Sequence, residues 1–200
     1  MGSNCCKKGK DDRKSVSPAS SYKKVIETNF LSSNPLTYKE EIDEFLWSNN
    51  SKSFTANKDG WRSLISSRQL PEHFSVSIKV IELRGVDNCS NGGIGVTTQS
   101  TITPKSCIGN KDTEYAIMPQ YKGGCFIYGG KNNNPINYGK EYKNGDIITI
   151  IYGKNKSLSF VINNENQGVA FENIKGPFYL MASLFFSGSQ LDILGVSPIH

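Results

Sequence analysis

After Trp47 the chain consists of short runs in which apolar and polar residues alternate. This alternation is typical of β-strands that have one buried and one wet face. Turn-forming residues, chiefly Gly, Asn, Pro and Asp, separate the runs at intervals that are common in all-β domains. The runs occupy residues 74–83, 146–152, 157–162, 178–184 and 190–194. Because no helical pattern separates them, the sequence predicts an all-β chain that forms an antiparallel sandwich or barrel.

One stretch before these runs has helical character. Thr37 and Glu40 have the spacing of a capping box, and the apolar residues among 37–46 can share one face of a helix. We therefore expect a short N-terminal helix that packs at the edge of the domain or, alternatively, docks a partner. The chain divides accordingly into a disordered tail over residues 1–24, an extension with this helix over 25–44 and a β-domain over 45–195.

The charge distribution separates the tail from the domain. The net charge is +5, and residues 1–24 hold seven lysines and arginines against two aspartates. The remaining residues therefore have no net charge, which argues against a nucleic-acid-binding face on the domain. A basic tail on a neutral domain is suited instead to an anionic membrane surface.

The first residues carry several membrane signals. Gly2 becomes N-terminal once Met1 is removed and fits the myristoylation pattern, except that Cys6 stands where Ser or Thr is usual. A myristoyl chain alone binds a membrane only marginally, so a second signal is needed. Cys5 and Cys6 offer thiols for palmitoylation, and the lysines that follow favour an anionic leaflet. These features predict lipidation at Gly2, Cys5 and Cys6 and a peripheral position on the cytoplasmic face of a membrane; the alternative is a plain polar tail.

The chain offers little for catalysis or metal binding. It has no C-x-x-C pair, and Cys89, Cys107 and Cys125 stand alone in the sequence. His73 and His200 are the only histidines, and neither lies beside a recognisable nucleophile motif. No Gly-rich phosphate loop is present, and no apolar run reaches the roughly 18 residues of a transmembrane helix. We expect no enzyme activity, no cofactor, no metal site and no small-molecule substrate.

From residue 138 onward, short motifs follow one another in a characteristic order. They are Tyr138-Gly139, Gly145-Asp146, a strand that ends at Asn163, the run Gly168-Val169-Ala170-Phe171 and an apolar strand over 178–183. This order resembles the SPRY domain, the β-sandwich binding module also found within B30.2 domains. Asn164 replaces the usual glycine after Asn163, and Gly153-Lys154 stands where an aspartate is common. The resemblance covers residues 45–195 and implies an antiparallel β-sandwich of the concanavalin-like jelly-roll type.

The resemblance assigns structural parts to several of these residues. Gly145 and Gly168 are expected to permit turns, and Asp146 to cap a turn rather than act in catalysis. The core between the sheets is expected to contain Phe160, Val169 and Phe171.

The resemblance also implies a binding surface, because SPRY domains recognise short peptides or protein surfaces through loops at one end of the sandwich. By position these loops are residues 84–91, 121–124, 127–138 and 185–189. Aromatic side chains in them offer anchors and polar ones offer specificity. The candidate partner-binding residues are Arg84, Asp87, Tyr121, Tyr128, Lys131, Asn133, Phe185 and Phe186. If residues 185 and 186 are extended, one ring should lie in the core and the other in solvent.

The sequence thus predicts a non-catalytic, membrane-anchored adaptor or scaffold that recognises a protein or peptide ligand. Two alternatives remain open. The asparagines at 132–134 near Tyr128 could imitate the polar residues of a carbohydrate-binding, lectin-like sandwich. The sandwich could also associate with itself as a structural protein on a membrane.

Overall fold

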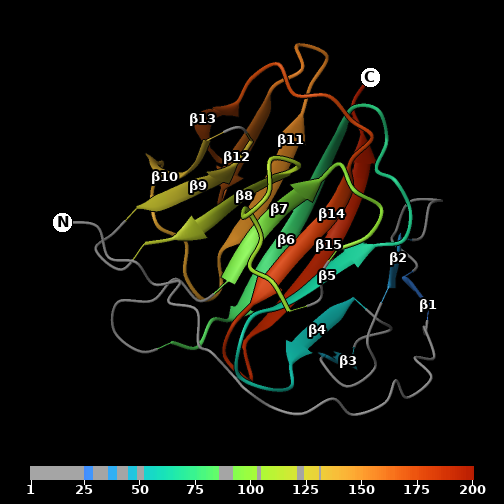
Figure 1. Ribbon diagram of the computed structural model, residues 1–200, viewed down its shortest axis with the longest axis vertical. Helices are drawn as coiled ribbons and strands as arrows, with labels where there is room; N and C mark the ends of the chain where they lie inside the picture. The colour runs from blue at the N-terminus through green and yellow to red at the C-terminus, as the bar shows by residue number, and fades with distance from the viewer. Residues whose placement is uncertain are drawn as a thin grey trace, which may run out of the picture.

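The computed structural model consists of two antiparallel β-sheets packed face to face (Figure 1). This arrangement confirms the predicted all-β sandwich. Among the described residues, no helix is long and apolar enough to span a membrane. The structure describes residues 25–28, 36–39, 45–48, 52–85, 92–102, 105–120, 124–130 and 132–200.

Sheet A contains eight strands in the order β1-β2-β5-β14-β7-β8-β9-β10. All neighbouring strands in it are antiparallel. Its strands are β1 (Val25–Thr28), β2 (Leu36–Lys39), β5 (Arg62–Ser66), β7 (Gly92–Thr97), β8 (Glu114–Pro119), β9 (Cys125–Gly129), β10 (Asn132–Tyr138) and β14 (Tyr179–Leu184).

Sheet B contains seven strands in the order β13-β12-β11-β6-β15-β4-β3. Its neighbouring strands are also antiparallel. Its strands are β3 (Phe45–Ser48), β4 (Ser53–Ala56), β6 (Phe74–Glu82), β11 (Ile147–Tyr152), β12 (Leu158–Ile162), β13 (Glu165–Phe171) and β15 (Gln190–Pro198).

The two strands closest to the C-terminus occupy interior positions. β14 lies between β5 and β7 in sheet A, and β15 lies between β6 and β4 in sheet B. In Figure 1 these two red strands run between strands that come much earlier in the chain. Both sheets are therefore assembled from distant parts of the sequence.

The alternation in β6 shows how the sequence produces the core. Phe74, Val76, Ile78 and Val80 point inward and are fully buried, whereas the residues between them are half-buried on the outer face. Burial of each such apolar side chain stabilises the fold by roughly 1.5–3 kcal/mol. All five predicted alternating runs form strands, and β15 continues past the predicted end at residue 194 to Pro198.

The helix predicted over residues 37–46 is wrong wherever the structure describes that stretch. Its beginning lies in β2, which pairs with β5, and its end lies in β3, which pairs with β4. Phe45 is buried and its ring lies 5.7 Å from that of Phe54, whereas Leu46 is 57% exposed. Adjacent residues thus point to opposite faces, as they do in a strand. Pairing with the open edges of the two sheets outweighs the local helical preference.

Residues 127–138 were predicted to form a loop, and this is also wrong. β9 extends to Gly129, Gly129 and Gly130 turn the chain with positive φ values of 121° and 67°, and β10 follows. The pairing between β9 and β10 shifts register between Asn132 and Ile136. A bulge of this kind interrupts the regular alternation by which a strand is recognised in a sequence.

The expected core residues differ in their burial. Phe160 is fully buried and Phe171 is half-buried against the core, but Val169 is 48% exposed. Val169 lies in the edge strand β13, whose pairing with β12 contains register shifts. Gly168 has a φ of +90° there, and Gly145 has a φ of +92°, so both glycines occupy the turn conformations expected of them.

A second layer of chain covers the outer face of sheet A. The segment between β7 and β8 lies in front of the strands in Figure 1 and packs apolar side chains onto them. Strands β7 and β14 beneath it are buried almost along their whole length, so they have lost the usual alternation. The buried cluster in this layer consists of Cys107, Ile108, Ala116, Met118 and Met181.

Buried polar groups anchor the same layer. The Ser63 hydroxyl donates to the Ser106 carbonyl oxygen (2.5 Å), and the Ile108 N–H donates to Ser183 Oγ (3.0 Å). The serine hydroxyls of sheet A therefore satisfy backbone groups of the covering segment that water cannot reach.

Glu114, at the start of β8, anchors the layer with a carboxylate. Its Oε2 accepts the N–H of Gly109 (2.8 Å) and that of Asn110 (3.1 Å). Burial raises the pKa of Glu114 above its usual value, although these backbone donors and Lys111 act in the opposite direction.

Candidate functional site

The loops of the sandwich gather at two ends. The lower end in Figure 1 carries the β4–β5, β10–β11 and β14–β15 loops and the start of the β6–β7 connection. The upper end carries the β5–β6, β11–β12 and β13–β14 loops. We use the names lower end and upper end for these two sets of loops.

The β4–β5 and β14–β15 loops lie side by side at the lower end, and each connects one sheet to the other. The Gly60 N–H donates to the Phe185 carbonyl oxygen (2.8 Å), and the Ser187 N–H donates to Asp59 Oδ1 (2.9 Å). Gly60 has a φ of +101°, a conformation that glycine adopts without strain. These hydrogen bonds fix the two loops relative to each other.

Three aromatic rings meet on these loops. Trp61 and Phe185 have ring centroids 5.3 Å apart at 76°, and Phe185 and Phe186 have centroids 4.8 Å apart at 70°. All three residues are half-buried. The expected division of Phe185 and Phe186 into one core and one exposed ring is therefore wrong, because they follow β14 in a loop where strand alternation does not apply.

Two arginines lie beside this aromatic cluster. The Arg84 guanidinium lies against Gly188, where an added Cβ would come within 2.6 Å of Arg84 Cζ. The Arg84 N–H donates to Ser189 Oγ (3.0 Å), which ties its backbone to the β14–β15 loop. Arg62 Nη1 donates to the Trp61 carbonyl oxygen (2.9 Å). Positive charge is thus held next to the three rings.

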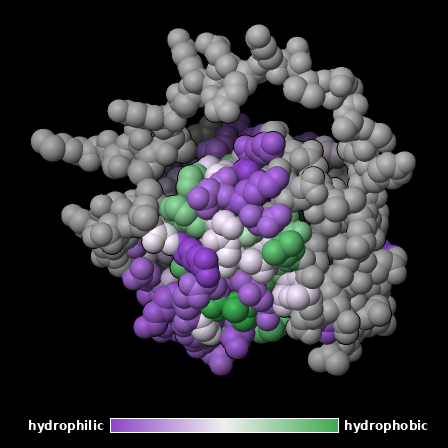
Figure 2. All heavy atoms as spheres, turned by 90° about the horizontal axis from the view of Figure 1, so that it is seen from below, coloured by the Kyte–Doolittle hydropathy of each residue, from purple (hydrophilic) through white to green (hydrophobic). Residues whose placement is uncertain are grey.

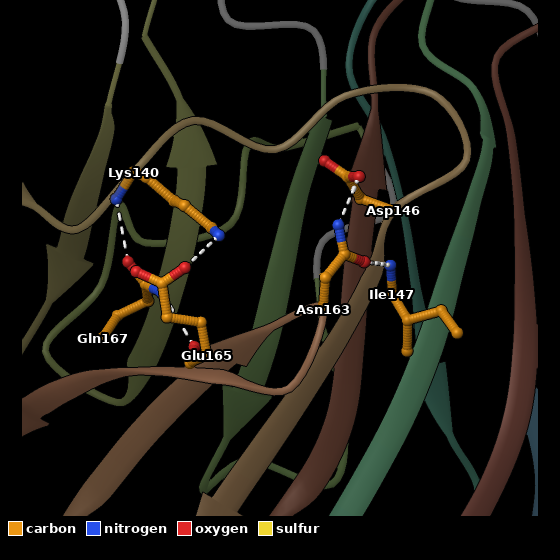
Figure 3. Close-up of polar contacts among 6 residues, drawn as sticks. All are labelled: Lys140, Asp146, Ile147, Asn163, Glu165 and Gln167. Atoms are coloured by element: carbon orange, nitrogen blue, oxygen red, sulfur yellow. Dashed lines mark hydrogen bonds and ion pairs between the residues drawn. The ribbon is translucent and has the colours of Figure 1, made fainter.

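The β10–β11 loop braces the neighbouring part of the lower end. Asp146 Oδ2 accepts the N–H of Lys143 (2.8 Å). Its Oδ1 accepts the side-chain amide of Asn163 (2.6 Å; Figure 3). Asn163 Oδ1 accepts the Ile147 N–H (2.9 Å). The expected turn-capping part of Asp146 is confirmed, and its oxygens are engaged in structural hydrogen bonds.

A second polar group at this end connects the β10–β11 loop to β13. The Lys140 ammonium forms an ion pair with Glu165, and the Lys140 N–H donates to Gln167 Oε1 (2.9 Å) (Figure 3). These contacts hold the β10–β11 loop against β13, and their polar groups are already paired with each other. The aromatic cluster with its arginines therefore has the more suitable geometry for a ligand.

Seen from the lower end, hydrophilic atoms cover most of the described surface and apolar atoms form small patches between them (Figure 2). Interfaces for protein ligands combine a few aromatic and arginine anchors with a polar rim. The combination of Trp61, Phe185, Phe186 and Arg84 has this composition, and its loops are already fixed before a ligand arrives.

The structure brings together three of the predicted partner-binding residues, Arg84, Phe185 and Phe186. Tyr128 does not join them. It lies in β9 and packs against Gly109, where an added Cβ would be 2.3 Å from Tyr128 Cβ. Its ring thus belongs to the second layer on sheet A. Asn133 lies in strand β10.

The remaining predicted residues lie outside the described part of the chain. They are Asp87, Tyr121 and Lys131 and the three lipidation residues Gly2, Cys5 and Cys6. Trp61 was not among the predicted partner-binding residues. The turn Asp59-Gly60 directly before it is the signal that could have placed its ring in a loop.

The two cysteine thiols in the described residues are unsuited to act as nucleophiles. Cys107 and Cys125 are both buried. Burial raises the pKa of Cys125 to about 12, and its Sγ donates to the Lys140 carbonyl oxygen (3.1 Å). Thiols of this kind are poor nucleophiles near neutral pH. Within the described residues, no group of three or more His, Cys, Asp or Glu residues could hold a metal ion.

Several solved structures are similar to this chain. A human SPRY domain matches at a TM-score of 0.60 and 12% identity over 75% of this chain and 94% of that domain. The SPRY domain of human HERC1 matches at a TM-score of 0.57 and 16% identity over 74% of this chain and 91% of that one. The NHR domain of Neuralized from Drosophila melanogaster matches at a TM-score of 0.58 and 15% identity over 84% and 95%, respectively.

These structural matches show that the chain has the fold of a SPRY-type β-sandwich. The sequence itself matches no model of a known protein family and no curated protein. The likeness therefore lies in the arrangement of the strands, and the chemistry of the loops must be read from this chain alone.

Proposed function

We propose that this protein is a membrane-anchored interaction module that binds a peptide or protein surface at the lower end of its sandwich. The observation that carries this proposal is the aromatic cluster of Trp61, Phe185 and Phe186 beside Arg84. SPRY domains are the structural neighbours, and recognition through end loops is the activity that the resemblance implies.

The geometry suits a protein ligand for an energetic reason. Half-buried rings offer apolar area to a partner, and the hydrogen bonds between the two loops hold these rings in place before binding. A partner therefore does not have to supply the free energy that would order flexible loops. The arginines add directional donors for carboxylates or backbone carbonyls.

The membrane part of the proposal rests on the sequence. Acylation at Gly2, Cys5 and Cys6, together with the basic tail, would hold the domain at the cytoplasmic face of a membrane. A binding surface kept there would meet membrane-associated partners at a high effective concentration. An adaptor or scaffold works in this way.

Peptide selection with the purified full-length chain tests the binding surface. Peptides enriched on the wild type should bind Phe186→Ala and Arg84→Ala at least about tenfold more weakly. Lys154→Ala, which changes an exposed residue of the β11–β12 loop at the upper end, should bind them as the wild type does. Unchanged affinity in both lower-end variants, with their circular dichroism spectra intact, would refute this surface.

Cell fractionation and mass measurement test the anchor. The wild type should carry acyl groups and sediment with membranes, Gly2→Ala should become largely soluble, and a Cys5→Ser/Cys6→Ser double variant should be partly released. Equal solubility and unmodified masses for all three proteins would refute the membrane part and leave the binding proposal standing.

A further inference from the structure

The upper end contains a cavity of about 420 Å³. It lies between the β5–β6, β11–β12 and β13–β14 loops, at the opposite end of the sandwich from the aromatic cluster. Its floor is formed by the buried rings of Tyr152 and Phe178, whose centroids are 4.7 Å apart at 64°. Pro71 and Pro177 contribute to its walls. A volume of this size with aromatic lining is typical of sites for small organic groups.

Lysines outnumber carboxylates around this cavity. Lys156, Lys175 and His73 line it together with one carboxylate, that of Glu72. In the part of the chain that the structure describes, neither lysine ammonium makes an ion pair. Burial, and after it the charge of Glu72, raises the pKa of Tyr152, so the floor stays neutral. The cavity therefore combines an uncharged aromatic floor with a rim that attracts anions.

His73 adds a second indication of a ligand. Its Nδ1 is buried and has no hydrogen-bond partner. The ring is held near Tyr152, with centroids 6.1 Å apart, and the His73 carbonyl oxygen accepts the Ile199 N–H (3.0 Å). A buried polar atom without a partner destabilises the fold. A polar group bound in the cavity could reduce this cost.

Hydrogen bonds between the loops fix the cationic rim. The Tyr152 hydroxyl donates to the Ile174 carbonyl oxygen (2.9 Å), and the Ile174 N–H donates to the Lys156 carbonyl oxygen (3.1 Å). The Leu70 N–H donates to the Phe178 carbonyl oxygen (2.7 Å) and ties the third loop to the other two. The backbones that carry both lysines are therefore positioned before any ligand binds.

From these features we infer that the upper-end cavity binds an aromatic phosphate, with the ring on Tyr152 and Phe178 and the phosphate between Lys156 and Lys175. Two ammonium groups match a phosphate dianion better than a single carboxylate charge, and lysine binds phosphate as a compact positive charge. The apolar floor of two aromatic rings set edge to face, with the prolines beside it, favours a ring next to that phosphate. Such a group occurs in free small molecules and in phosphorylated tyrosine side chains of proteins. The inference does not depend on the function proposed for the lower end.

Titration of the ¹⁵N-labelled full-length protein with phenyl phosphate, followed by NMR, tests the site. Binding should shift the amide signals of Tyr152, Gly153 and Gly176 and leave those of Phe185 and Phe186 in place. Phenol and inorganic phosphate should each bind at least about tenfold more weakly, because each lacks half of the ligand. Shifts that map elsewhere, or inorganic phosphate binding as well as phenyl phosphate, would overturn the inference.

Charge variants test which groups bind the phosphate. Lys156→Ala and Lys175→Ala should each weaken phenyl phosphate binding by about three- to tenfold, whereas Glu72→Gln should strengthen it. Lys154→Ala removes an exposed lysine of the same hairpin that does not line the cavity and should change the affinity less than about twofold. An equal loss in Lys154→Ala and Lys156→Ala would show a general charge effect and overturn the site.

Two further ligands distinguish the possible sources of the aromatic phosphate. A peptide that contains phosphotyrosine should bind more tightly than free phosphotyrosine if the natural ligand is a protein, and equally if it is a small molecule. In both cases the dephosphorylated ligand should lose most of its affinity. Retained affinity after dephosphorylation would contradict the inference.

Discussion

The outer faces of the two sheets differ in what covers them. On sheet A, β7 is buried along its whole length and β14 nearly so, because the segment between β7 and β8 packs over them. On sheet B, β6 and β12 alternate between buried inner residues and half-buried outer ones. The chain thus builds two layers on one side of the core, sheet A and the segment that covers it, and a single sheet with a wet outer face on the other.

This difference shows which side chains pack inside the fold and are therefore less available to a ligand. The sequence predicts that Tyr128 contacts a ligand. In the structure it lies on sheet A and packs against Gly109 of the covering segment. Phe185 and Phe186 lie beyond the end of β14, where their half-buried rings are outside this covering layer. Substitutions on the covered face should therefore change stability much more than substitutions on the open face.

The largest effect is expected from Ile108→Ala. This side chain is fully buried between the covering segment and sheet A, so its truncation leaves a cavity. The free energy of unfolding should fall by about 2–5 kcal/mol. Urea denaturation followed by tryptophan fluorescence measures it. A loss below about 1 kcal/mol would mean that the covering layer contributes little to stability.

Gly93→Ala should have the next largest effect. A Cβ at this position would lie 2.3 Å from Ile108 Cγ2 and 2.8 Å from Met118 Cε, so one of the two layers must shift. We expect a loss of about 1–3 kcal/mol in the same denaturation assay. The Gly93→Ala/Ile108→Ala double variant should lose less than the sum of the single changes, because the second change removes the obstructing methyl group. Strict additivity would contradict this packing.

Glu114 gives the covered face a smaller, pH-dependent contribution. Its pKa is raised by folding, so the folded state favours the protonated form. The stabilisation that results is greatest below the unfolded-state pKa and is lost as the pH rises through the folded-state pKa. Relative to the wild type, Glu114→Gln should therefore gain stability as the pH rises from about 4 through the raised folded-state pKa of Glu114. The exposed Glu172→Gln serves as the control, and parallel stability curves for Glu114→Gln and the wild type would contradict the prediction.

Substitutions on the outer face of sheet B should hardly change the free energy of unfolding. Ile147 begins β11 and is 37% exposed. Ile147→Thr keeps a β-branched side chain in a strand and should change the free energy of unfolding by no more than about 0.5 kcal/mol. Calorimetric melting is sufficient to detect a larger change. A loss comparable with that of Gly93→Ala would mean that sheet B is covered as well.

The two faces also explain how much of the fold could be predicted from the sequence. Strands with one wet face, such as β6 and β12, show the alternation that identifies them. β10 lies at the edge of sheet A and carries a register shift. Because this shift interrupts the alternation, the sequence predicted a loop there. The short strands β2 and β3 were missed because their conformation depends on pairing with β5 and β4, which the local pattern of Thr37 and Glu40 does not reveal.

The candidate site was predictable to a similar degree. The resemblance placed Arg84, Phe185 and Phe186 in loops at one end, and the structure brings these three residues together. Trp61 was missed because its contact with Phe185 joins loops that are far apart in the sequence. The cavity at the upper end gave no sequence signal, since His73, Tyr152 and Lys175 come from three separate segments of the chain and form no motif.

The interior positions of β14 and β15 have a consequence for the synthesis of this protein. Without these two strands, sheet A separates into β1-β2-β5 and β7-β8-β9-β10, and sheet B separates into β13-β12-β11-β6 and β4-β3. A nascent chain on the ribosome therefore cannot complete either sheet until residues 179–198 have emerged. Until then its unpaired strand edges and apolar faces are exposed to other chains. Chaperones that shield such edges would be needed most in that interval.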